Sequence, residues 1–270
     1  MPERFELTPA SESINRRGVM KGAAWSVPVM AVAVATPAAS ASACAQTYAG
    51  TVRFAAVDAA PVNYTRGTGA NATLAGAASV ALPAVNGFTT GAVNVTFSSS
   101  SLTSAATGGT YARDTRNFAA DSTVAPGKFA IVQTVTGASV ATQNPVRGQT
   151  VDIAFSRPVT GLSFRLEGIT AGTTYNDAVT LTTVTGAALA ATASSVGAQV
   201  AGNGTAANPW RSNAENANQG TITAANSLVV TIPGTISSLR LRYNSWGGTT
   251  TTAQAQGVFL GNMTFTTRCS

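Results

Sequence analysis

Strict alternation of apolar and polar residues recurs along this chain and constrains its fold more than any other feature. The clearest case is the segment VDIAFS at 151–156, where Val, Ile and Phe take one face and Asp, Ala and Ser take the other. Successive side chains of a β-strand point to opposite faces, so this segment predicts a half-buried strand. Similar segments, separated by turn residues, occur at 51–56, 93–97, 129–135, 162–166, 179–182, 228–232, 239–243 and 263–266.

The residues after position 43 have a composition that suits strands and turns. They are rich in Thr, Ala, Val, Gly, Ser and Asn and poor in Lys, Glu and Leu. Val and Thr fit a pleated surface, whereas Gly and Asn fit turns. No charged or Pro-rich linker and no repeat of fixed period divides residues 44–270. We therefore expect an all-β fold, a single antiparallel β-sandwich with jelly-roll or Greek-key connections, whose first and last strands are adjacent.

Residues 1–43 have the three parts of an export signal peptide, which we expect to be helical or disordered. A basic region that contains Arg16, Arg17 and Lys21 is followed by an apolar stretch at 22–36 and by small residues at 37–43. The paired arginines resemble the twin-arginine signal, and residues 21–42 resemble the leaders of exported proteins of high-GC Gram-positive bacteria. A membrane anchor is the alternative, but the apolar stretch is shorter than the roughly 20 residues that a bilayer requires.

These features predict contact with the export translocase, cleavage after Ala41 or Ala43, and an extracellular or cell-surface protein with no membrane contact after cleavage. Cleavage leaves Cys44 at or near the new N-terminus, and Cys269 is the only other cysteine. Two cysteines in an exported protein favour a disulfide between them. The segment ending in Cys44 also resembles a lipobox, so lipidation of this residue is the alternative.

The segment 144–179 resembles an element of exported and surface β-sandwich proteins of bacteria. Its FSRPVT and LSFRL stretches, followed by an acidic turn and YNDAV, carry the resemblance, and residues 204–211 and 257–265 add to it. Domains of this kind serve as adhesive, carbohydrate-binding or structural modules. The resemblance therefore implies a fold and a non-enzymatic role, rather than a particular chemistry.

The sequence lacks the residues that several kinds of active site need. The chain contains no histidine, so a Ser-His-Asp triad and the commonest zinc sites are excluded. After the leader, Lys128 is the only lysine and seven residues are acidic, with no closely spaced set of carboxylates on one strand. A glycoside hydrolase on a jelly-roll scaffold, with a pair of acids such as Glu167 and Asp177 from distant segments, remains the enzymatic alternative.

Two acidic residues and an amide suggest one metal hypothesis. Glu167, Asn176 and Asp177 could hold a calcium ion together with loop carbonyl groups, because Ca²⁺ binds six to eight oxygen atoms. The alternative is that these are solvated polar residues of a turn. No other cofactor is predicted.

Aromatic and basic residues give the best sequence evidence for binding. Trp210 and Trp246 lie in turn-rich segments, and Tyr243, Arg240 and Arg242 precede Trp246. Exposed rings can stack on sugars, although large aromatic residues are also commonly buried in the hydrophobic core.

Charge indicates the kind of partner. Residues 44–270 contain twelve basic and seven acidic residues, and the charge is 12 − 7 = +5. Arg240 and Arg242 fall on one strand face, with Arg165 expected on a neighbouring strand. No nucleic-acid-binding module is recognisable, which favours a glycan or an anionic cell-wall polymer as the partner. The sequence thus predicts a secreted or cell-surface module with a binding, structural or adhesive role.

Overall fold

The computed structural model describes residues 46–56, 60–87, 89–102, 110–120, 125–137, 143–172, 175–213, 221–246 and 250–268. Within these ranges the chain forms strands and two single-turn 3-10 helices, and no α-helix. None of the helical segments in this part of the chain is long and apolar enough to cross a bilayer. The predicted signal peptide with Arg16, Arg17 and Lys21 lies outside the described residues, as do Cys44 and Cys269.

The strands follow one another along a single compact unit that begins at Thr47. Their bounds are β1 Thr47–Val52, β2 Tyr64–Arg66, β3 Ala75–Val80, β4 Val93–Ser101, β5 Thr110–Arg113, β6 Phe129–Gly137, β7 Gln143–Glu167, β8 Ala171–Gly172, β9 Tyr175–Thr182, β10 Thr192–Ser194, β11 Val200–Ala201, β12 Trp210–Ser212, β13 Leu228–Trp246, β14 Thr250–Leu260 and β15 Met263–Arg268. The short helices are Gly69–Asn71 and Ala224–Asn226.

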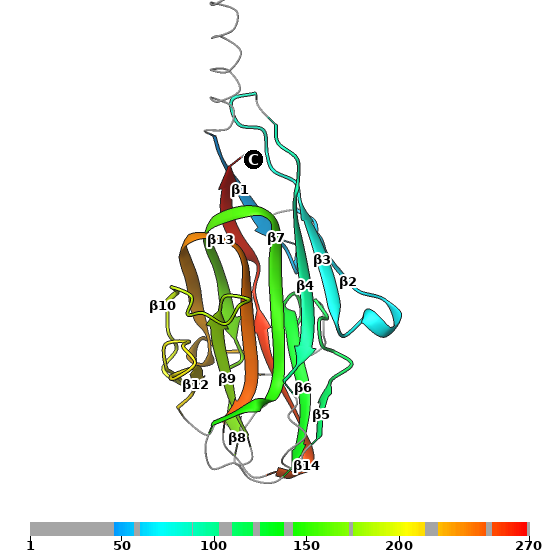
Figure 1. Cartoon of the computed structure of the whole chain (residues 1–270), viewed down its shortest axis with the longest axis vertical. Helices are drawn as coiled ribbons and strands as arrows, with labels where there is room; N and C mark the ends of the chain where they lie inside the picture. The colour runs from blue at the N-terminus through cyan, green and yellow to red at the C-terminus, as the bar shows by residue number, and fades with distance from the viewer. Residues whose placement is uncertain are drawn as a thin grey trace, which may run out of the picture. The chain divides into compact units, whose positions relative to one another are not determined.

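The strand pairs are antiparallel, and two long strands connect two layers of a sandwich (Figure 1). In one layer the order is β2-β3-β4-β7-β13-β9-β12-β11, formed by the first half of β7 and the second half of β13. In the other layer β10 lies beside the first half of β13, and the second half of β7 pairs with β14 and β15. Strands β5 and β6 join this layer through β14, although they fall between β4 and β7 in sequence. This non-sequential order agrees with a Greek-key type of connection, and the all-β sandwich prediction is confirmed.

Both long strands bend between the layers, and their apolar alternation changes phase at the bend. In β7 the buried residues are odd-numbered from Val151 to Phe155 and even-numbered from Leu162 to Leu166. In β13 they are even-numbered from Leu228 to Ile232 and odd-numbered from Leu239 to Tyr243. Register shifts fall between Ile232 and Thr235 and between Ile236 and Ser238. An irregular step of this kind moves the alternation by one residue, so that both halves face one shared interior.

The sequence prediction of separate strands at 151–156 and 162–166, and again at 228–232 and 239–243, is therefore wrong in one respect. Each pair is one continuous bent strand. The residues read as turns, including Pro158 and Gly161 in β7, lie within the bend, where Gly161 has a φ of +64°. Pairing between β7 and β13 continues on both sides of the bend, which is why the chain does not leave the sheet.

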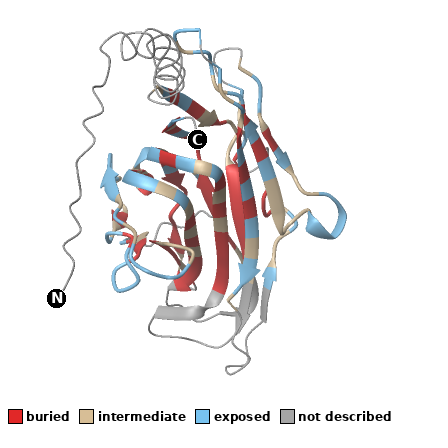
Figure 2. Cartoon of the chain, turned by 45° about the horizontal axis from the view of Figure 1, so that its top comes forward, coloured by how far each residue is buried: buried red, intermediate tan, exposed pale blue. Residues whose placement is uncertain are grey.

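The interior is apolar and includes a cluster of aromatic rings. Phe54, Tyr64, Phe97, Phe118 and Phe129 form contacts with ring centroids 4.8–5.9 Å apart. Figure 2 shows buried and exposed positions alternating along the strands around this interior. The hydroxyl of Tyr64 donates to the carbonyl oxygen of Phe118 at 2.9 Å, so the one polar atom of the cluster is paired.

The first and last strands are adjacent, as the sequence predicts. β1 pairs with β15 from Thr47 opposite Arg268 to Val52 opposite Met263. This pairing brings together the segments that lead to the two cysteines. The disulfide itself stays a prediction, because both cysteines lie outside the described residues.

Candidate functional site

Two aromatic residues predicted to bind a ligand are inside the molecule. Trp210 is 1% exposed and Tyr243 is fully covered. Trp210 packs on Gly204 so closely that a Cβ atom added there would lie 2.7 Å from the ring. A stacking platform needs an open face, so burial corrects the prediction for both residues. Trp210 instead closes the core beside β9, as large aromatic side chains commonly do.

The third predicted aromatic residue, Trp246, is the last residue of β13. Its backbone pairs with Gln143 of β7. Its side chain lies outside the described part of the chain, so a binding role for Trp246 stays a prediction.

The predicted basic strip is only partly formed. Arg240 and Arg242 alternate with buried residues and share the outer face of β13, and burial lowers the pKa of Arg242. Arg240 forms a two-pronged ion pair with Asp152 on β7, at 2.6 and 2.7 Å. Arg165 lies in the half of β7 that belongs to the other layer, where its Nε lies 2.8 Å from Glu167 Oε1. The three arginines therefore do not form one strip.

The residues of the predicted calcium site use their oxygen atoms elsewhere. Lys128 Nζ lies 2.7 Å from Glu167 Oε2, and Arg165 contacts the other oxygen. The amide of Asn176 exchanges two hydrogen bonds with the backbone of Ser212, at 3.1 and 3.2 Å. Asp177 accepts hydrogen bonds from Thr170 and Tyr243. These contacts give no support to a shared calcium site, which remains a sequence hypothesis.

Asp177 has a buried carboxyl group. It accepts hydrogen bonds from the Tyr243 hydroxyl at 2.5 Å and from the Thr170 backbone amide and hydroxyl, each at 2.9 Å. Burial raises the pKa of Asp177 to about 7, against hydrogen bonds from Tyr243 and Thr170 that lower it. This arrangement joins β9 to β13 within the interior and offers no accessible surface to a substrate, because Asp177 is fully covered.

Acidic residues within the described ranges do not share partners. Asp114 pairs with Arg116 at 2.7 Å, while Asp152, Glu167 and Asp177 have the separate partners given above. Among the described residues there is also no group of three or more His, Cys, Asp or Glu side chains that could hold a metal ion. Glu167 and Asp177, which the glycosidase hypothesis pairs, are bound by different groups: Lys128 and Arg165 contact Glu167, whereas Thr170 and Tyr243 donate to Asp177.

The feature that the structure adds is a row of hydroxyl groups on the outer face of one layer. Cross-strand register aligns residues of β1, β15, β7, β13 and β10 in the order Thr51, Thr264, Ser163, Thr231 and Thr192. A second row, one step further along the strands, consists of Thr266, Thr160 and Thr235. All eight side chains are partly or fully exposed, and we call them the hydroxyl face.

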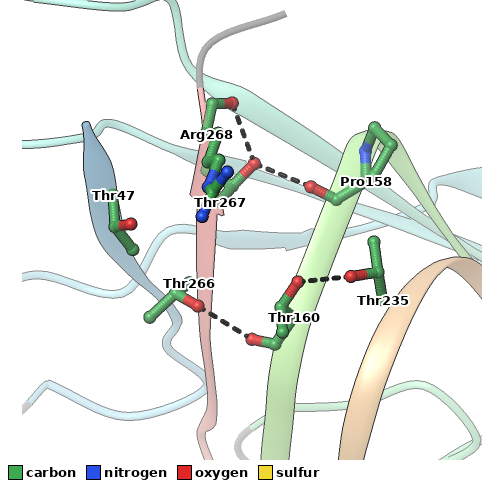
Figure 3. Close-up of a pocket in the computed structure, with 7 residues that line it drawn as sticks. All are labelled: Thr47, Pro158, Thr160, Thr235, Thr266, Thr267 and Arg268. Carbon is green, nitrogen blue, oxygen red and sulfur yellow. Dashed lines mark hydrogen bonds between the residues drawn. The ribbon is translucent and has the colours of Figure 1, made fainter. Parts of the chain in front are cut away.

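A hollow of about 560 Å³ lies at the end of the hydroxyl face, next to the bend of β7 and β13 (Figure 3). It is lined by Thr47, Pro158, Thr160, Thr235, Thr266, Thr267 and Arg268. Its volume is within the range of ligand pockets, roughly 300–1,000 Å³. The wall therefore offers hydroxyl groups and one exposed guanidinium group.

Hydrogen bonds fix four of the five threonines that line the hollow. The hydroxyls of Thr160 and Thr235 lie 2.7 Å apart, and the hydroxyl of Thr266 donates to the Thr160 carbonyl at 3.1 Å. The hydroxyl of Thr267 donates to the Pro158 carbonyl at 2.7 Å. A hydroxyl has one donor hydrogen and two acceptor lone pairs, so these groups keep capacity for a ligand.

Sequence reasoning missed this face. Individual threonines, such as the pair around Phe265, were visible as the polar half of an alternating strand. Their alignment depends on the register of strands that are far apart in sequence. No local pattern in the chain reports that register.

No protein-family model matches the chain, and the searches of curated proteins and of solved structures found no match either.

Proposed function

We propose that the mature chain is an exported, non-catalytic β-sandwich that binds an anionic, hydroxyl-rich polymer of the cell surface through its hydroxyl face. The observation that carries this proposal is the row from Thr51 to Thr192 across five strands. It continues through the second row into the hollow that contains Arg268. Hydroxyl groups that both donate and accept complement the hydroxyls of a sugar, and arginine complements a phosphate or carboxylate group.

The dimensions favour a polymer over a single small molecule. Neighbouring strands are about 4.8 Å apart, so a row across five strands is about 19 Å long. Neither row contains an acidic residue that would repel an anionic chain. The predicted export signal adds support, because wall polymers are found where an exported protein is released.

A binding experiment with the secreted form tests the proposal. Residues 44–270 would be applied to a glycan array and incubated with isolated cell walls. We expect T160V/T235V, which removes two hydroxyls at nearly constant volume, to weaken retention at least tenfold. The matched variant T160S/T235S keeps both hydroxyls and should bind like the wild type.

Charge is tested separately at Arg268. We expect R268Q to weaken retention of anionic polymers and to reduce its dependence on salt. R116Q removes the same charge from a partly buried ion pair in the 114–117 turn, away from the hollow, and serves as the control. Wild-type binding by T160V/T235V to every retained polymer would refute the role of the hydroxyl face.

A further inference from the structure

The sandwich interior changes from apolar to polar towards one end of its strands. In four strands the inward positions continue from apolar or aromatic residues to amide or hydroxyl residues. On β6 Gln133 follows Ile131, on β7 Gln149 precedes Val151, on β14 Gln256 precedes Val258, and on β13 Ser245 follows Tyr243. Each of these polar side chains is at most 9% exposed. We call the four residues, together with Asn117, the polar layer.

One half of the polar layer has complete hydrogen bonding. Asn117 and Gln149 each donate to the other's carbonyl oxygen, at 3.2 and 3.3 Å. The remaining groups of Asn117 bind the Thr73 carbonyl and the Val132 amide. Those of Gln149 bind the Ser99 hydroxyl and the Val132 carbonyl. Both amides therefore use two donors and two acceptor sites, which is the full capacity of the group.

The other half is incomplete at Gln133. This residue is 0% exposed, and its Nε2 donates to Gln256 Oε1 at 3.5 Å, the upper limit for a hydrogen bond. Gln256 donates in turn to the Ser245 hydroxyl of the facing layer at 3.3 Å. Gln133 Oε1 is buried and receives no hydrogen bond from any described residue. A buried amide oxygen without a donor is unfavourable, and most such groups in folded proteins are paired.

Rotating the amide does not remove the deficit. If Gln133 and Gln256 were both turned by 180°, their contact could persist, but an amide nitrogen of Gln133 would then occupy the unpaired position. The missing partner is therefore a donor in one orientation and an acceptor in the other. A water molecule can serve as either, whereas a metal ion fits only the amide oxygen and a carboxylate fits only the amide nitrogen.

We propose that Gln133 forms an internal binding site for a water molecule. This site is separate from the hydroxyl face, because Gln149 and Pro158 are nine residues apart along β7. The bound water would complete the polar layer in the same way that the Ser99 hydroxyl completes it at Gln149. It would extend the chain of contacts that joins β6 and β14 to the facing layer.

A crystal structure of residues 44–270 at high resolution tests the proposal. We expect ordered density for a single oxygen atom within hydrogen-bonding distance of the Gln133 amide oxygen. An interior without density at Gln133 would overturn the proposal.

Two matched variants test the site in solution. Q133M replaces the amide by an apolar side chain of similar size, and magnetic relaxation dispersion should detect at least one fewer long-lived internal water molecule. Q149M removes an amide whose partners are all protein groups and should lower the unfolding midpoint more than Q133M does. Equal counts of long-lived water molecules in Q133M and the wild type would contradict the proposal, whatever T160V/T235V does to polymer binding.

Discussion

At the scale of single residues, burial decides the chemistry of Asp177. Its carboxyl group is fully buried and accepts hydrogen bonds from Tyr243 and Thr170. Desolvation penalises the ionised form more than these hydrogen bonds favour it, so the pKa is raised to about 7. The folded chain therefore binds a proton at Asp177 over a pH range in which the unfolded chain has already released it.

This difference predicts a pH-dependent stability. Between about pH 4 and pH 7 the folded state binds more protons, so the free energy of unfolding should fall as the pH rises, by roughly 2–4 kcal/mol from this group. D177N should remove that slope, which denaturant titrations from pH 4 to 8 would measure. D114N is the control, because Arg116 lowers the pKa of Asp114 and its titration falls below this window. An identical slope in D177N and the wild type would exclude Asp177 as the cause.

Gly204 is a second residue whose role depends on its surroundings. It has a φ of +76°, and the ring of Trp210 occupies the position of a Cβ atom. We expect G204A to lower the free energy of unfolding by about 2–4 kcal/mol, from backbone strain and overpacking together. G69A is the matched control, since Gly69 also has positive φ, of +58°, but nothing lies within 4 Å of its Cβ position. Thermal unfolding should show a loss of only about 1 kcal/mol for G69A, and equal losses would contradict the role of Trp210.

At the scale of elements, the bend of β7 and β13 depends on the phase of the apolar alternation. The two halves of β13 bury residues of opposite parity, and the irregular register between Ile232 and Ser238 makes the change possible. A strand of uniform alternation would turn one of its halves outward at the bend. The phase change was visible in the sequence, but nothing local distinguished a bend within one strand from a turn between two strands.

Deletion of one residue in the bend tests this interpretation. Gly234 has no atom near its Cβ position, so its removal loses no packing and changes only the register. We expect the deletion to prevent cooperative unfolding, because one half of β13 would expose its apolar face. Circular dichroism and solubility would report this result. Deletion of Gly186, in the turn closed by a 2.9 Å hydrogen bond to Thr183, should be tolerated far better, and a fully stable Gly234 deletion would refute the argument.

At the scale of the whole molecule, the pairing of β1 with β15 places the first and last described strands side by side. Thr47 lies opposite Arg268. Thr47 is three residues after Cys44, and Arg268 is one residue before Cys269. A disulfide here would close a loop of more than 200 residues and restrict the unfolded chain strongly.

We expect the exported protein to contain no free thiol under denaturing conditions, as measured by alkylation and mass spectrometry. Reduction or the C44S variant should lower the free energy of unfolding by up to about 5 kcal/mol. The wild type measured with reductant is the control for C44S, and the two should agree. Two free thiols in the exported form would contradict the disulfide, and a lipid adduct on Cys44 would establish the alternative.

The sequence alone determined the all-β class and the apolar faces, because alternation is a local property that each strand carries in its own residues. It also indicated that the first and last strands are adjacent. It did not determine the burial of Trp210 and Tyr243, the bends of β7 and β13, or the hydroxyl face. Those features depend on pairing between residues such as Thr51 and Thr264, which lie more than 200 positions apart. Only the tertiary structure sets that register, because many strand arrangements satisfy the same local pattern and packing of the shared core selects one of them.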